Sequence, residues 1–135
     1  MFGFSYSRAV LESFEHPLHA GRARGDPAEL IVGRAGSMKA GALVELSLRV
    51  APGGVTEARF RAFGCPHTIA AASRVAQQIE GQPIEALEGF DIQAIADELE
   101  VPAGKLGRLL IVADALVGCL AEWRRRPPGT DTKQR

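Results

Sequence analysis

The residue with the clearest chemical potential is Cys65, which lies where two different sequence patterns meet. The stretch before it, VTEARFRAF, alternates apolar and charged residues, which is the period of a β-strand with one buried face. The stretch after it, PHTIAAASRVAQQIEG, places apolar residues at helical spacing. Pro66 suits a first helical position, because its missing N–H would have no partner there. Cys65 is therefore expected at or near the N-cap of a helix.

A thiol at a helix N-cap meets the positive end of the helix dipole and unpaired backbone N–H groups, and both favour the thiolate. We therefore expect the pKa of Cys65 to lie below the free value of about 8.5. The thiolate is the form that binds iron or attacks sulfur. The pattern leaves one alternative open, which is an inert cysteine buried in a tight turn.

The composition limits the number of domains and the kinds of partner. With 135 residues, 46% of them hydrophobic, the chain is long enough for one domain with a core and short for two. We predict a single domain over residues 1–126 and a disordered polar tail over residues 127–135. Sixteen basic residues balance sixteen acidic ones, so no net charge attracts nucleic acid or an anionic membrane.

The cysteine count and the hydrophobic pattern predict a location. Two cysteines without a C-x-x-C pair are too few for a disulfide framework, which favours a reducing compartment. The chain also lacks an apolar stretch of the roughly 18 residues that a membrane-spanning helix needs. We predict a cytoplasmic protein with no membrane or nucleic-acid partner.

Three stretches have strand patterns, at residues 28–33, 41–50 and 55–63. Short links between successive strands predict an antiparallel meander with one polar face and one face available for helices. The link GRAGSMKAG, between the first two strands, is expected to be a mobile connection. The earlier segment HPLHAGRARGDP is expected to be a loop, or an edge that becomes ordered against a partner.

Helical patterns occupy much of the remaining chain. Asp91 is a candidate cap for a short helix over 91–99, and a long, largely apolar helix is expected over about 104–125. A first helix over 5–15 ends before Pro17. Together with the strands, these elements predict the α+β class.

Several landmarks, in order along the chain, resemble one family. They are the F-x-x-P of residues 14–17, the strand LVELSLRV, the segment ARFRAFGCPHTIAAAS, and ELEVPAGK (98–105) before a helix that contains Ala-Asp-Ala. Over residues 6 to about 123 the chain is similar to the iron–sulfur cluster assembly scaffolds, the IscU proteins and the N-terminal domain of NifU. The resemblance implies a three-stranded antiparallel sheet with helices packed on one face.

The family's chemistry uses three cysteines from three loops, with an aspartate and a histidine nearby, and this chain matches it only in part. Cys65 is retained. Ala40 and Ala42 stand where the family has its first cysteine and the aspartate, and Gly107 and Arg108 stand where it has the histidine and the third cysteine. The resemblance therefore implies that one of three thiolate ligands remains.

Three other residues could change the chemistry of a site that keeps one of its three cysteines. His67 could supply a nitrogen ligand, since mixed Cys/His ligation of iron–sulfur centres occurs, although a histidine in a first helical turn is expected to face solvent. Cys119 lies about 16 Å along the helix from Arg108 at 1.5 Å per residue, so it is expected to be a core thiol. Arg108 is expected close to Cys65, where it would favour the thiolate and repel ferrous iron or zinc.

The family resemblance implies a non-enzymatic protein of iron–sulfur cluster assembly that handles iron or sulfur through Cys65. Its expected partners are a cysteine desulfurase, as the donor of a persulfide sulfur, and other assembly proteins. An iron–sulfur cluster, iron or zinc is expected to bind weakly or not at all to the isolated chain, because a closed site needs four donors and the missing ones must come from outside.

Two alternatives are of a different class. In one, the chain has lost its ligands and acts as a non-catalytic adaptor or regulator that binds a desulfurase or another assembly partner. In the other, it is a thiol enzyme with Cys65 as nucleophile, His67 as base and Arg108 as oxyanion partner.

A second family landmark concerns recognition by a partner. In the family, a dedicated chaperone binds a Leu-Pro-Pro-x-Lys segment. The corresponding VPAGK of this chain keeps one proline and the lysine, which makes Val101, Pro102 and Lys105 candidate partner-binding residues.

Overall fold

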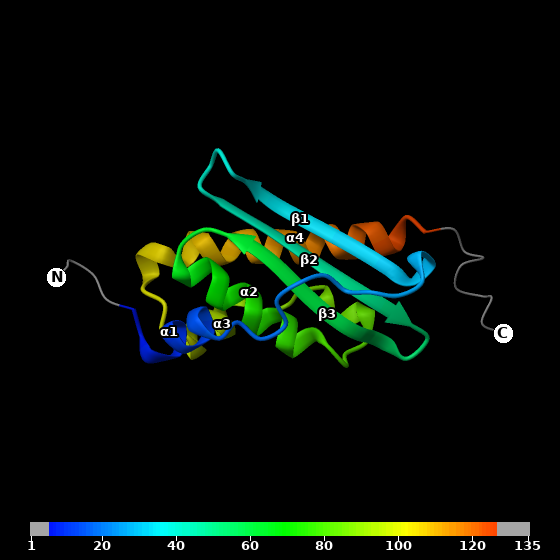
Figure 1. The fold of residues 1–135 in the computed structure, drawn as a ribbon, viewed down its shortest axis with the longest axis horizontal. Helices are drawn as coiled ribbons and strands as arrows, with labels where there is room; N and C mark the ends of the chain where they lie inside the picture. The colour runs from blue at the N-terminus through cyan, green and yellow to red at the C-terminus, as the bar shows by residue number, and fades with distance from the viewer. Residues whose placement is uncertain (1–5, 127–135) are drawn as a thin grey trace.

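The structure is a computed structural model that describes residues 6–126, and Figure 1 shows its elements. The strands are β1 (Leu30–Ser37), β2 (Ala42–Ala51) and β3 (Gly54–Phe63). The helices are α1 (Arg8–Glu15), α2 (Pro66–Ile79), α3 (Ile92–Glu98) and α4 (Leu106–Arg124). Three short 3₁₀ turns are η1 (Pro27–Glu29), η2 (Ile84–Leu87) and η3 (Ala103–Lys105).

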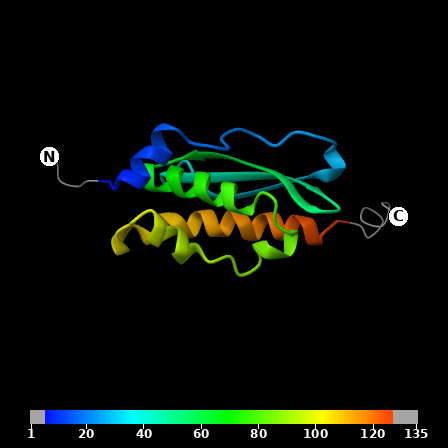
Figure 2. The ribbon, with the colours of Figure 1, turned by 90° about the horizontal axis from the view of Figure 1, so that it is seen from below.

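The three strands form an antiparallel sheet in the order β1-β2-β3. Helices α2 and α4 cover one face of this sheet (Figure 2), and the core lies between them and the strands. The alternation in β2 explains the arrangement, since Val44, Leu46 and Leu48 all point to this face and are fully buried. The predicted α+β fold, with helices packed on one face of a three-stranded sheet, is confirmed.

The other face of the sheet, which we call the outer face, is crossed by residues 16–26, called the strap below. Gly21 N–H donates to Phe60 O at 2.8 Å, and Phe60 N–H donates to His19 O at 2.9 Å. Farther along, Ala23 N–H donates to Ser47 Oγ at 2.8 Å. The segment that was expected to be a loop or a partner-dependent edge is therefore ordered against its own sheet.

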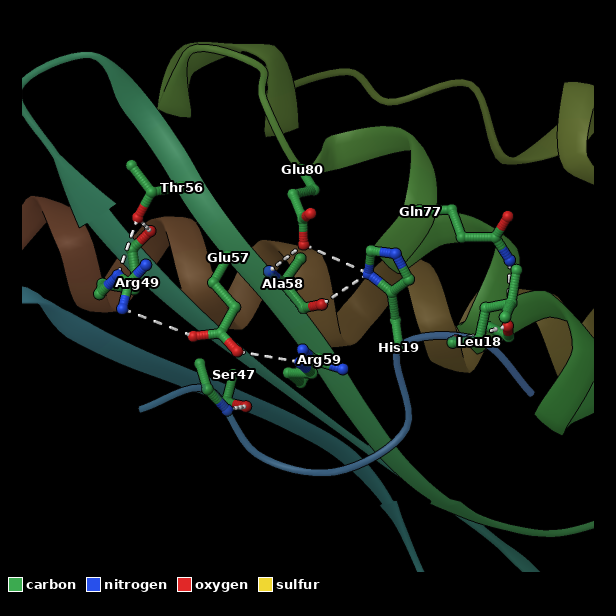
Figure 3. A network of polar contacts seen from close by, with 12 residues as sticks. Leu18, His19, Ser47, Arg49, Thr56, Glu57, Ala58, Arg59, Gln77 and Glu80 are labelled. Carbon is green, nitrogen blue, oxygen red and sulfur yellow. Dashed lines mark hydrogen bonds and ion pairs between the residues drawn. The ribbon is translucent and has the colours of Figure 1, made fainter. Parts of the chain in front are cut away.

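The His19 side chain anchors the strap beside the C-terminal end of α2 (Figure 3). Its Nδ1 lies 2.9 Å from Ala58 O and 3.3 Å from the Glu80 carboxylate. The same carboxylate accepts the Ala58 N–H at 3.0 Å. The His19 ring and the Glu80 carboxylate thus provide hydrogen-bond partners for both the carbonyl and the N–H of Ala58 in β3.

Strand β1 is longer than the sequence pattern predicted. Its ladder with β2 continues through the pair Arg34↔Glu45 to the pair Ser37↔Ala42. Only residues 38–41 form the turn, so the expected mobile connection over 33–41 is wrong for its first part. In this extension Arg34 forms an ion pair with Glu45 of the neighbouring strand, a long-range contact that the glycine-rich sequence does not reveal.

Helix α4 lies unusually close to β1 at Gly33. A Cβ at this position would lie 2.5 Å from the backbone N of Cys119 and closer still to the carbonyl oxygen of Ala115. Gly118 on the helix faces the same spot, because its own Cβ position is 3.3 Å from Gly33 Cα. Two glycines therefore allow the backbones of helix and strand to meet directly.

The terminal residues 1–5 and 127–135 lie outside the described part of the chain. The predicted single domain over 1–126 and the predicted disordered tail over 127–135 therefore stay predictions. Within residues 6–126, no helix combines the length and the apolarity that crossing a membrane would require.

Candidate functional site

Cys65 occupies the joint between β3 and α2, as the sequence predicted. Gly64 links the two elements with φ +154°, a conformation that favours glycine. Cys65 is the N-cap residue in extended conformation, and Pro66 is the first residue of the helix. The thiol is partly exposed. Cys65 is therefore not the fully buried, inert cysteine that the sequence left open as an alternative.

The surroundings of Cys65 favour its thiolate. Burial by itself raises the pKa of Cys65, but the N–H groups of Thr68 and His67, the Thr68 hydroxyl and the positive charge of Arg108 together outweigh burial and lower it. The sulfur lies 3.7 Å from Thr68 Oγ1. The pKa of the thiol is thus lowered by its position at the helix N-terminus and by a neighbouring cation.

The joint between β3 and α2, the β1–β2 turn and the start of α4 lie at the same end of the molecule (Figure 1). The pair Leu43↔Phe63 brings the start of β2 beside the end of β3, so the 38–41 turn lies at the same end of the sheet as the joint. From the other side, the first turn of α4 approaches closely enough for Arg108 to act electrostatically on both Cys65 and His67. Of the three segments that the family resemblance implied, the first turn of α4 thus acts on Cys65 directly, and a shared ligand site with the 38–41 turn stays a prediction.

The four positions that the resemblance assigns to missing ligands lie in these segments. Ala40 is exposed in the 38–41 turn, and Ala42 is buried at the start of β2. Gly107 is exposed and Arg108 is half-buried, both in the first turn of α4. Among residues 6–126, no three His, Cys, Asp or Glu side chains are grouped so that they could hold a metal ion.

The donor set therefore does not fit an iron–sulfur cluster held by this chain alone. One partly exposed thiol is available at the site, whereas a closed tetrahedral centre uses four nitrogen or sulfur donors. Arg108 and Lys105 add positive charge near the thiol. That charge opposes binding of a cation and favours an anion.

His67 differs from its expected orientation toward solvent. Its residue is only 3% exposed, and its ring packs against the ring of Tyr6, with the centroids 4.9 Å apart. Neither ring nitrogen has a hydrogen-bond partner among the described residues. Burial, together with the charges of Lys105 and Arg108, lowers the pKa of His67. Tyr6, two residues before α1, thus packs against the first turn of α2, which the local pattern around Cys65 could not indicate.

The thiol enzyme alternative needs a hydrogen bond between the Cys65 sulfur and the His67 ring. Among the described residues, the sulfur contacts Thr68 instead, and the imidazole makes no hydrogen bond. The cationic imidazole of a thiolate–imidazolium pair is also disfavoured by the lowered pKa of His67. The geometry does not support this alternative.

Cys119 is a core thiol, as predicted. It is fully buried, and its sulfur lies 3.6 Å from Leu46 O. Burial raises its pKa to about 12. Cys119 therefore contributes to packing between α4 and the sheet and has no thiolate chemistry near neutral pH.

The candidate partner-binding segment lies between α3 and α4. Val101 is half-buried, and its N–H donates to Ala96 O at 2.9 Å. Pro102 and Lys105 are exposed, and the charge of Lys105 reaches His67. The segment thus borders the Cys65 site, and its role in binding a partner stays a prediction.

Sequence reasoning missed two residues that shape the site. Thr68 lies three residues after the N-cap, where side chains commonly reach back to the cap, so its contact with Cys65 had a signal in the spacing. Tyr6 is far from Cys65 in sequence, and its packing on His67 depends on the placement of α1 against α2. No local pattern indicates such a contact.

The fold and the site together define a small α+β domain with an activated thiol at its strand-to-helix joint. Residues 5–129 match the family described as the NifU-like N terminal domain. The chain belongs to this family.

The alignments with similar proteins cover most of the chain. The iron-sulfur cluster assembly scaffold protein IscU of Haemophilus influenzae is 26% identical over 123 residues, which cover 90% of this chain and 98% of that protein. IscU of Escherichia coli K12 is 27% identical over 123 residues, 90% of this chain and 96% of that protein. The crystal structure of a NifU-like protein (N-terminal) from Brucella abortus superposes with a TM-score of 0.68 at 18% identity, covering 89% of this chain and 94% of that one.

Proposed function

We propose that this protein is a scaffold-like component of iron–sulfur cluster assembly that carries sulfur, or iron, on Cys65. The observation that carries the proposal is an activated thiol at the strand-to-helix joint of a NifU-like N-terminal domain. The proposal is supported by the curated relatives, which are named as assembly scaffolds. Cluster binding requires ligands from a second molecule.

The charges around Cys65 favour sulfur as its cargo. Arg108 stabilises an anionic sulfur on Cys65 and disfavours a nearby cation. Lys105 contributes positive charge at His67 beside it. A persulfide is an anionic form of sulfur that needs only one cysteine, whereas a metal ion needs several donors.

Sulfur would reach Cys65 by thiol–disulfide chemistry. The Cys65 thiolate attacks the outer sulfur of a persulfide on a cysteine desulfurase, forming a new S–S bond. The S–S bond of the desulfurase persulfide breaks, and its electron pair leaves with the desulfurase cysteine as a thiolate. Sulfur is transferred with no external oxidant or reductant, and Cys65 becomes the persulfide.

In this proposal the chain carries intermediates and does not itself catalyse a reaction. Its partners are the sulfur donor and those assembly proteins that complete the ligand set or receive the sulfur. The cytoplasmic location stays a prediction, and so does the binding of a chaperone at Pro102 and Lys105.

The test is anaerobic incubation with a cysteine desulfurase and cysteine, with and without ferrous iron. We expect intact-protein mass spectrometry to detect the gain of one sulfur atom on the wild-type chain, and peptide mapping to place it on Cys65. Cys65→Ser should abolish the gain. The matched control is Cys119→Ser, which should retain it, because Cys119 is buried.

Visible absorption in the same reactions follows cluster formation. We expect no stable cluster chromophore on the isolated chain, and a chromophore only when a thiol such as glutathione is added as an outside ligand. If neither sulfur nor a chromophore appears on Cys65 while the desulfurase still binds, the sulfur-carrying proposal fails and the adaptor alternative replaces it.

A further inference from the structure

The outer face of the sheet, with the strap across it, carries six arginines that we call the arginine face. They come from the strap and from all three strands: Arg22, Arg24, Arg34, Arg49, Arg59 and Arg61. None of them contributes to the Cys65 site.

Three of these arginines share the carboxylate of Glu45. The Nε atoms of Arg34 and Arg61 lie 2.9 Å and 3.0 Å from its oxygens, and Arg22 contributes two contacts at 3.3 Å. The side chain of Glu45 is 7% exposed, whereas each of the three arginine side chains is more than half exposed. The buried Glu45 carboxylate therefore fixes the positions of three guanidinium groups. Much of each arginine side chain stays open to solvent.

Glu57 organises the other half of the arginine face (Figure 3). Its carboxylate accepts a hydrogen bond from Arg59 Nε at 2.9 Å and from the backbone N–H of Arg24 at 3.2 Å, and it lies 3.7 Å from Arg49 Nη1. Beside it, the strap and β3 enclose a surface hollow of about 300 Å³. The hollow is lined by Ala20, Gly21, Arg22, Arg24, Glu57 and Arg59.

The arginine face carries more positive than negative charge. In the described part of the chain, the six arginines contact two glutamates, Glu45 and Glu57. Glu80, at the edge of β3, is paired with His19 of the strap. Asp26, the next acidic residue along the strap, already accepts the Ala28 N–H as the cap of η1. Because the whole chain has a net charge of zero, the rest of it must be net negative.

The matching negative charge is concentrated around η2 and α3. This segment carries Glu85, Glu88, Asp91, Asp97, Glu98 and Glu100, all exposed. Two of these are paired with arginines from other helices, Glu88 with Arg124 and Glu98 with Arg74, so the segment keeps a negative excess. Figure 2 shows η2 and α3 on the far side of α4 from the sheet, whereas the strap lies on the opposite side. The molecule is thus electrically polarised across its layers.

We propose that the arginine face is a docking surface for an acidic polypeptide segment of a partner protein. Guanidinium groups bind carboxylates in a planar, bidentate fork, and holding them in place beforehand reduces the entropy lost on binding. The hollow beside Glu57 provides room for one acidic side chain among Arg22, Arg24 and Arg59.

Two observations favour a polypeptide over a nucleic acid. The outer-face positions of the strands around the arginines are aliphatic, polar or charged, and Phe63, at the end of β3, is the aromatic residue nearest to them in the strand pattern. A platform for base stacking is therefore lacking at the centre of the face. The balanced net charge of the chain also lacks the strong basic excess that is typical of nucleic-acid binding domains.

The test uses a fluorescein-labelled oligo-glutamate peptide as the probe and fluorescence anisotropy as the readout, with no iron or sulfur donor present. Its result is therefore independent of the Cys65 proposal. We expect wild-type binding that weakens with added salt, as for screened charge pairs. The double variant R24Q/R59Q should bind about tenfold more weakly, since it removes two charges from the hollow. Glu57 retains the Arg49 guanidinium and the Arg24 backbone N–H in this variant.

The matched control is R8Q/R125Q, which removes two exposed arginines elsewhere on the chain and should change binding less than twofold. Far-UV circular dichroism checks that both variants fold. The proposal is overturned by an absence of wild-type binding at low salt, or by equal weakening in the control. Tighter binding of a DNA duplex of equal charge would assign the face to nucleic acid instead. Self-association by sedimentation velocity that R24Q/R59Q abolishes would assign it to a second copy.

Discussion

The reactivity of Cys65 depends on a few identified groups, of which the Thr68 hydroxyl is the easiest to remove. Thr68→Val keeps a β-branched side chain of similar size but deletes the hydroxyl 3.7 Å from the sulfur. The pKa of Cys65 should then rise, because one hydrogen bond that lowers it is lost. We expect alkylation by iodoacetamide near neutral pH to become a few-fold slower, since the thiolate is the nucleophile.

The pH dependence of that alkylation rate reports the pKa directly. Thr56→Val, on the exposed outer face of β3, is the control and should leave the profile unchanged. Identical profiles for the wild type and Thr68→Val would show that the backbone N–H groups and Arg108 suffice without the hydroxyl.

His67 makes the stability of the protein depend on pH. Burial and two neighbouring cations lower its pKa in the folded state below the ordinary value of 6.5, so the unfolded chain takes up a proton at higher pH than the folded one. The stabilisation from a neutral His67 is therefore complete above about pH 6.5 and is lost as the pH falls through the lowered folded pKa. We expect the free energy of unfolding to fall as the pH is lowered from about 7 through the ordinary pKa of histidine.

Urea unfolding at a series of pH values checks this expectation. His67→Phe keeps an aromatic ring against Tyr6 and should flatten the dependence in that range. His16→Gln, an exposed histidine after α1, should not alter the part due to His67. A slope that persists unchanged in His67→Phe would locate the titrating group elsewhere.

At the level of elements, the contact between α4 and β1 predicts that alanine substitution at two glycines, Gly33 and Gly107, has very different effects on stability. Gly33→Ala forces a Cβ against the backbone of Ala115 and Cys119. Neither backbone can move without separating helix from strand. We expect a loss of about 1–3 kcal/mol in the free energy of unfolding, as for overpacked cores.

Gly107→Ala is the matched control, since nothing lies within 4 Å of its Cβ position in the first turn of α4. This substitution should be neutral or stabilising by up to about 1 kcal/mol, because alanine favours helix. Urea denaturation measures both variants. Equal effects at the two sites would mean that the close helix–strand approach is not rigid.

Elements with their own periodicity could be predicted from the sequence, and those that depend on distant partners could not. The strand ending at Phe63, the helix beginning at Pro66 and the cap at Cys65 follow from a change of period and one proline. The strap has no period. Its order comes from hydrogen bonds that its backbone makes to the Phe60 backbone and to the Ser47 hydroxyl. The burial of His67 likewise depends on Tyr6, which is distant in the chain.

At the scale of the whole molecule, the fold of the NifU-like N terminal domain family is kept, and the resemblance predicts a site that has lost two of three thiolates. If the three segments around Cys65 still hold the geometry, Ala40→Cys combined with Arg108→Cys should restore a metal centre. Three thiolates plus water complete a tetrahedral zinc site. We expect the double variant to retain stoichiometric zinc after desalting, as measured by elemental mass spectrometry, and the wild type to retain little.

The same double variant with Cys65→Ser is the control and should lose most of the zinc. Zinc retention that is independent of Cys65 would mean that the new thiols bind metal away from the joint. A failure of the double variant to bind zinc, with the fold intact, would place the three segments too far apart for shared ligation.

The burial of Cys119 has a consequence for the response of this protein to oxidants. Cys119 is enclosed between α4 and the sheet, so it cannot reach an oxidised Cys65 without disruption of the core. A sulfenic acid formed on Cys65 therefore has no resolving cysteine within the fold, and any disulfide it forms must join this chain to another molecule. Repair of an oxidised Cys65 depends on the thiols that surround the protein.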